Sequence, residues 1–104
     1  MDRLKIEPYD SKYKFDFEIL NREWIEEYFE MEQEDLNILQ NPEDYVIKKG
    51  GEVFFAILEN RVVGTAAMVL TTMGVYELAK MAVNKDYQGM GIGRSLLQRS
   101  IKFA

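Results

Sequence analysis

Two residue types are missing from this chain of 104 residues, which has no cysteine and no histidine. Without cysteine, the chain can form no disulfide, no thiolate metal site and no cysteine nucleophile. Without histidine, it can form no Ser-His-Asp triad and lacks the commonest metal ligand, so no metal is expected. Proton transfer near neutral pH must therefore use a carboxylate, a tyrosine, a lysine, water or the backbone.

Long apolar runs and a basic cluster are also missing. No stretch approaches the ~20 apolar residues that span a bilayer, and the start, "MDRLKIEPYD", shows no secretory signal, so a cytoplasmic location is expected. The 13 basic and 18 acidic residues give a net charge of −5, which makes nucleic acid and anionic membranes poor partners and favours a cationic one, such as an amine. The length and the lack of repeats or linkers predict a single domain over residues 1–104.

The first half of the chain has a helical pattern. An apolar stripe at helical spacing is formed by Trp24, Ile25, Tyr28 and Phe29. We expect Asn21 to be the N-cap of this helix, because its side-chain oxygen can accept from a free backbone N–H. The "NP" pair at positions 41–42 is expected to end the helical region.

The second half has the shorter period of strands. Residues 52–58 and 61–70 predict a hairpin that turns at the "EN" pair of positions 59–60, and Gly64 indicates a bulge or a close approach. A third strand is expected over residues 75–83, and the helical period returns from Ile92. The predicted class is α/β (α+β), with N-terminal helices, a mostly antiparallel sheet and a last helix.

Glycines alternate at positions 89, 91 and 93 in "NKDYQGMGIGRS", between the third strand and the last helix. A glycine loop leaves backbone N–H groups open, and the first N–H groups of a helix have no partner within it, so the junction suits a phosphate. The first helical turn has no acidic residue and contains Arg94, which also fits an incoming anion. A tight turn beside a solvated Arg94 explains the same residues.

The hexapeptide "QGMGIG", which follows "MAV" and precedes "RSLL", resembles the Q/R-x-x-G-x-G/A signature of the GNAT superfamily of N-acetyltransferases. The resemblance implies acetyl-CoA as co-substrate, with its diphosphate on the loop and helix start and its pantetheine arm along the strand end. It implies that an N–H of that strand end stabilises the oxyanion. The cofactor-binding residues so implied are Met81, Ala82, Val83, Gln88, Gly89, Met90, Gly91, Ile92, Gly93 and Arg94.

The resemblance further implies that a primary amine, of a small molecule or of a peptide, attacks the thioester directly and that Glu77 is the general base. By strand alternation, Glu77 should share a face with Ala79, Met81 and Val83, with Lys80 on the opposite face. Burial in this apolar stretch would make Glu77 a better proton acceptor. A glutamate paired with a nearby cation is the alternative. The acceptor site implied by the family lies along the first helices, where Trp24, Tyr28, Phe29 and Glu30 are candidates, although such an aromatic stripe also suits a core.

The chain departs from the family in length. It stops at Ala104 within the last helix, whereas family members usually continue with another strand, a helix and a final hairpin. We therefore expect an open sheet edge beside the third strand, in a truncated chain or in a homo-oligomer that covers the edge. Two other functions stay open. One is a non-catalytic acyl-CoA-binding or sensing module, and the other is an interaction domain in which the loop is only a turn.

Overall fold

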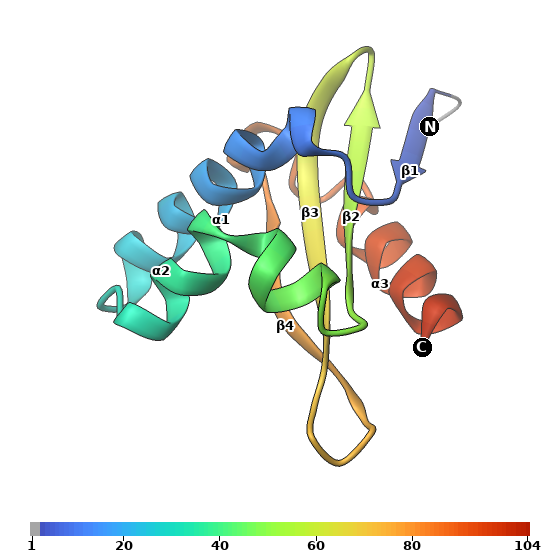
Figure 1. Cartoon of the computed structure of the whole chain (residues 1–104). Coiled ribbons are helices and arrows are strands. Elements are labelled where there is room, and N and C mark those ends of the chain that lie inside the picture. Colours follow the sequence, from blue (N-terminus) through green and yellow to red (C-terminus); the bar gives the residue numbers. More distant parts are fainter. Residues whose placement is uncertain (1–2) are drawn as a thin grey trace.

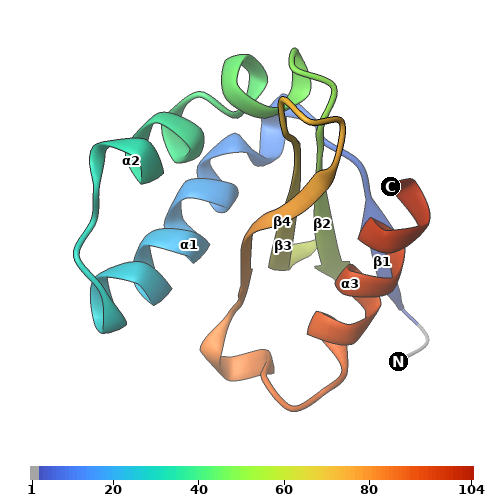
Figure 2. The same cartoon turned by 90° about the horizontal axis from the view of Figure 1, so that it is seen from below.

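A four-stranded antiparallel sheet forms the middle layer of the computed structural model, which describes residues 3–104 (Figure 1). Its strands lie in the order β1 (Leu4–Glu7), β2 (Glu52–Leu58), β3 (Arg61–Leu70) and β4 (Tyr76–Val83). Helices α1 (Lys14–Tyr28) and α2 (Gln33–Gln40) cover one face, and α3 (Ile92–Phe103) covers the other (Figure 2). The predicted fold class is confirmed, since an antiparallel sheet with helices on both faces gives three layers of mixed α/β structure.

The core has two halves, one on each face of the sheet. On the side of α1 and α2, Phe17 and Leu39 pack against Phe55 of β2. On the side of α3, Ile92 and Leu96 pack against Phe54 of the same strand. Neighbouring phenylalanines on β2 thus point to opposite faces, as strand geometry requires, and this explains why residues 53–58 are apolar without interruption.

The predicted β2–β3 hairpin is confirmed. Glu59 and Asn60 form the turn with φ of 51° and 67°, the positive values that suit the right-handed twist of a hairpin. Both features that Gly64 indicated are also present. The β2–β3 register shifts beside it, because Ala56 pairs with Gly64 and the next residue pairs with Val62. In addition, a Cβ on Gly64 would lie 3.0 Å from Leu96 and 3.1 Å from Ile92 of α3.

The prediction of Asn21 as an N-cap is wrong. Helix α1 begins at Lys14, so Asn21 lies in its middle and is buried, with 2% of its surface exposed. The apolar face extends toward the N-terminus through Phe17 and Leu20, both buried. The amide stays within the helix because its Nδ2 donates to the carbonyl oxygen of Phe17, one turn earlier, at 2.8 Å.

The expected end of the helical region needs correction. Helix α2 ends at Gln40, just before the "NP" pair, but Pro42 starts a π-helical turn, η2 (Glu43–Ile47), so the helical region continues beyond the pair. Pro42 fits the first position of a turn because its φ of −62° is helical and its missing N–H is not needed there. The short edge strand β1 was not predicted, since four residues that pair only with β2 carry little periodic signal.

No helix within residues 3–104 has the length and apolar character needed to cross a membrane.

Candidate functional site

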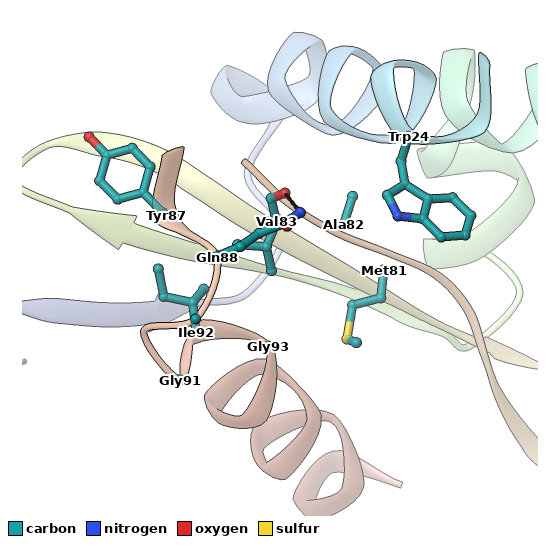
Figure 3. Close-up of a pocket in the computed structure, with 10 residues that line it drawn as sticks. Trp24, Met81, Ala82, Val83, Tyr87, Gln88, Gly91, Ile92 and Gly93 are labelled. Carbon is teal, nitrogen blue, oxygen red and sulfur yellow. Dashed lines mark hydrogen bonds between the residues drawn. The ribbon is translucent and has the colours of Figure 1, made fainter. Parts of the chain in front are cut away.

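A cavity of about 340 Å³ lies between α1, the end of β4 and the start of α3 (Figure 3). We call it the loop cavity. Most of the predicted cofactor-binding residues line it, whereas Met90 and Arg94 do not. The lining consists of Trp24, Met81, Ala82, Val83, Tyr87, Gln88, Gly89, Gly91, Ile92 and Gly93.

Two glycines of the loop have a backbone conformation that favours glycine. Gly89 and Gly91 have φ of 80° and 82°, in the left-handed region that other residues rarely adopt. A Cβ at either position would meet no atom within 4 Å, so their side-chain side is open. Glycine is therefore required here by conformation, and it leaves space beside the main chain.

Unpaired N–H groups gather at the start of α3. Gly91 is the N-cap, and the N–H of Ser95 donates to the Gly91 oxygen at 3.1 Å as the first bond of the helix. The N–H groups of the preceding helical residues therefore have no partner within the helix. The first turn has no acidic residue and Arg94 is exposed, so this end of the helix keeps its positive potential.

Side chains fix the loop to the sheet. Asn84 donates its N–H to the Val63 oxygen at 2.8 Å, and its side chain caps the short turn η3 (Lys85–Tyr87) by accepting from the Asp86 N–H at 2.9 Å. Gln88 Nε2 donates to the Val83 oxygen at 3.3 Å. Tyr87, which the sequence reasoning missed, lines the loop cavity with the Arg61 guanidinium 5.6 Å from its ring centre. An aromatic residue next to the glycines was the available signal.

The predicted faces of β4 are wrong because the strand has a bulge at Ala79. Lys80 pairs with Ala67 and Leu78 pairs with Met68, which leaves Ala79 without a partner. The extra residue reverses the alternation, so Glu77 and Lys80 lie on the face that α1 and α2 cover, whereas Met81 pairs with Ala66 on the other face. Glu77 is exposed rather than buried and does not line the loop cavity.

Two smaller cavities of about 220 Å³ each adjoin Trp24. The helix cavity lies between α1 and η3 and contains Tyr28. The bulge cavity lies between α1, α2 and the bulge of β4 and contains Phe29. Trp24 lines all three cavities, whereas Glu30 is exposed and lines none of them. Of the predicted apolar stripe, only Ile25 is therefore buried in the core, and the three aromatic side chains line cavities.

An ion pair closes one side of the bulge cavity. Lys80 Nζ lies 2.8 Å from Asp35 Oδ1, and their side chains are only 17% and 22% exposed. The other oxygen of Asp35 accepts from the Glu32 N–H at 3.1 Å within the capping box of α2. The Lys80 hydrogen bond, with help from the Glu32 N–H, lowers the pKa of Asp35 against the opposing effect of burial. The pair therefore ties α2 to β4 at the bulge.

The sheet has one long open edge. Within residues 3–104, β4 pairs only with β3, so its other side is unpaired. Leu78 and Met81 on this strand are each 39% exposed. The open edge expected beside the third strand is therefore present in the part of the chain that the structure describes.

Comparison with known proteins gives consistent matches. The Acetyltransferase (GNAT) family profile matches residues 17–104. N-acetylaspartate synthetase of Xenopus tropicalis is 39% identical over 64 residues, which are 60% of this chain and 24% of that protein.

Solved structures show the same fold. A GNAT-family acetyltransferase of Staphylococcus aureus Mu50 matches with a TM-score of 0.85 at 25% identity, over 96% of this chain and 64% of that chain. A predicted acetyltransferase of Clostridium acetobutylicum, solved with acetyl-CoA, matches with a TM-score of 0.71 at 17% identity, over 95% and 71% of the two chains. The chain thus spans about a quarter of the curated relative and under two thirds of the S. aureus structure.

Proposed function

Because this chain belongs to the acetyltransferase (GNAT) family, we propose that it transfers an acetyl group from acetyl-CoA to a primary amine. The observation that carries the proposal is the loop cavity, where unpaired N–H groups of α3 meet two open glycines and no acidic residue. These features suit the diphosphate of a coenzyme. The C. acetobutylicum relative, which was solved with acetyl-CoA, has the same fold.

The end of β4 supplies the second part of the proposed site. Met81, Ala82 and Val83 line the loop cavity between Trp24 and the glycines, so a pantetheine arm could pair with their backbone along the open edge. An N–H of this strand end would then donate to the thioester oxygen and stabilise the negative charge that develops there. Arg94 lies outside the cavity lining but is exposed in the first turn of α3, and we propose that it contacts a phosphate.

The reaction needs no covalent intermediate with the protein. The nitrogen of the amine forms a bond to the acetyl carbon, the bond between this carbon and sulfur breaks, and a proton passes from nitrogen to base and finally to the thiolate. We propose Glu77 as the base, directly or through water. It shares its face of β4 with Lys80, which lines the bulge cavity. Glu77 itself is exposed, whereas the sequence suggested that it is buried.

Two measurements test this proposal. Isothermal titration with CoA should show binding, and absence of heat at millimolar CoA would leave only an interaction domain. Thiol release over a panel of amines should then be faster than thioester hydrolysis, and Glu77→Gln should reduce it about tenfold or more, since general base catalysis is worth 10²–10⁴-fold. Glu34→Gln, an exposed glutamate of α2, is the matched control. CoA binding without transfer to any amine would support a non-catalytic acyl-CoA-binding module.

We also propose that a second copy of the chain covers the outer edge of the first half of β4, before the Met81–Val83 segment that is assigned to the pantetheine arm. The unpaired backbone of this half and its half-exposed Leu78 support this. Light scattering after size exclusion should give a dimer mass, and Leu78→Lys should shift it to the monomer. A monomeric parent chain would contradict the proposal.

A further inference from the structure

We propose that the acceptor is a small primary amine that also carries a carboxylate, and that it binds in the bulge cavity. Its two polar anchors would be Asn21 Oδ1 for the amine and Lys80 Nζ for the carboxylate. This inference rests on the proposed acetyl transfer and adds the class of acceptor. It follows from the hydrogen-bonding groups that the cavity leaves unused.

Asn21 provides an unused acceptor. The residue is 2% exposed yet lines the bulge cavity. Its Nδ2 donates to the Phe17 oxygen at 2.8 Å, which fixes the orientation of the amide. Its Oδ1 receives no hydrogen bond from any residue of the described part of the chain. Because Asn21 lines the cavity and its oxygen has no protein partner there, this oxygen can accept an N–H that a ligand brings.

Lys80 provides a positive charge and N–H donors that are not all used. An ammonium group has three N–H bonds, and the only hydrogen bond of Nζ among the described residues goes to Asp35 Oδ1. The second oxygen of Asp35 is occupied by the Glu32 N–H. The pair therefore satisfies Asp35 and leaves Lys80 with capacity for a second anion, in a cavity where its side chain is only 17% exposed.

The walls define the rest of the ligand. Apart from Asn21, Asp35 and Lys80, the cavity is lined by the apolar side chains of Trp24, Ile25, Phe29, Ala79 and Met81. Its volume of about 220 Å³ corresponds to roughly seven water molecules at about 30 Å³ each, so the ligand must be compact. Asp35, the only carboxylate of the lining, is already paired, so a polycation would find little to bind.

The bulge cavity is also placed for transfer. It shares Trp24 and Met81 with the loop cavity. Met81 is the lining residue of β4 farthest along the chain from the glycines, so it marks the end of the loop cavity opposite the diphosphate. An amine held by Asn21 would therefore approach the thioester from the side of the bulge.

The intrinsic fluorescence of Trp24 gives a direct binding test, because it is the only tryptophan and lines both cavities. The protein is titrated with alanine, alanine methyl ester and ethylamine, with and without CoA. We expect alanine to bind about tenfold tighter than the other two, which lack the carboxylate charge. Equal affinities for the three compounds, or no response to alanine, would overturn the inference.

Three variants separate ligand binding from structure. Lys80→Gln and Asp35→Asn both remove the ion pair, but only the first removes the positive charge. We expect Lys80→Gln to weaken alanine about tenfold and ethylamine less than twofold, whereas Asp35→Asn keeps or improves alanine binding. Asn21→Leu should weaken alanine and ethylamine alike, with CoA affinity unchanged. If Lys80→Gln and Asp35→Asn behave the same, the role of Lys80 is structural and the inference is wrong.

Thiol release distinguishes this failure from that of the proposed function. If CoA binds and other amines are acetylated while alanine shows no preference, the acceptor class is wrong and acetyl transfer stands. If CoA gives no heat, both proposals are wrong.

Discussion

The side-chain amide of Gln88 donates to the backbone oxygen of Val83 at 3.3 Å and so joins the glycine loop to the last residue of β4. Both residues line the loop cavity and also the helix cavity behind it. Glycines alone cannot hold one backbone shape, because they have more accessible conformations than other residues. The bond therefore limits the positions that the loop can take relative to the strand.

Gln88→Leu removes this bond while keeping the size of the side chain. A neutral hydrogen bond contributes about 0.5–1.5 kcal/mol, so we expect CoA affinity to fall about two- to tenfold in isothermal titration. Gln98→Leu, at an exposed position of α3, is the control. Unchanged affinity in Gln88→Leu would show that the loop is held by other contacts.

Charge reversal tests the start of α3. Arg94→Glu places a negative charge in the first turn, where a phosphate is proposed, and we expect CoA affinity to fall about tenfold or more. Lys102→Glu makes the same change of charge in the last turn of the same helix and should have little effect. The loss should shrink as salt is raised. Equal losses in both variants would contradict a local phosphate contact.

Two glycine substitutions should separate loop conformation from space. Gly91→Ala puts a side chain at φ of 82°, which costs about 1–2 kcal/mol, so the melting temperature should fall by several degrees. Gly93→Ala lies within α3, with Val83 Cγ2 as the nearest atom at 3.9 Å, and should keep or raise stability. Because Gly93 lines the loop cavity, it should still weaken CoA. Scanning calorimetry and CoA titration measure the two effects.

Acid should weaken the link between α2 and β4. The pKa of Asp35 lies below its ordinary 3.8 in the folded chain because of Lys80, so the folded state favours the charged carboxylate. The resulting stability is present above about pH 4 and is lost as pH falls through the folded pKa. Urea unfolding should therefore show the parent about 1–2 kcal/mol more stable than Asp35→Asn near neutral pH, with a smaller difference near pH 3. A constant difference would contradict the assignment.

Much of the fold could be predicted because its signals are local. The "EN" turn requires two positive φ angles, and the apolar run of β2 after Glu52 follows from burial on both faces. The start of α1 and the strand β1 could not be predicted. Asn21 suggested a cap, but its Nδ2 donates to the Phe17 carbonyl within the helix, and the residues of β1 pair with residues of β2 that lie 48 or more positions away.

Some features of the candidate site could also be predicted from the sequence, and others could not. The glycine loop between β4 and α3 could be predicted, because its alternating glycines mark a backbone of unusual torsions, and Gly89 and Gly91 have positive φ. The bulge at Ala79 has no signal in a pattern of period two, and it reversed the faces of Glu77 and Lys80. The Lys80–Asp35 contact joins elements 45 residues apart and needed the folded chain to be seen.

We expect Gly64, which lines none of the three cavities described above, to influence the proposed coenzyme site. With no Cβ, it allows Ile92 and Leu96 to rest directly on β3, and Ile92 is the first residue of α3. Any larger residue there would act as a spacer and would push the mouth of the helix, with its N–H groups, away from the end of β4. The spacing between α3 and β4 therefore depends on a residue that the proposed coenzyme would not touch.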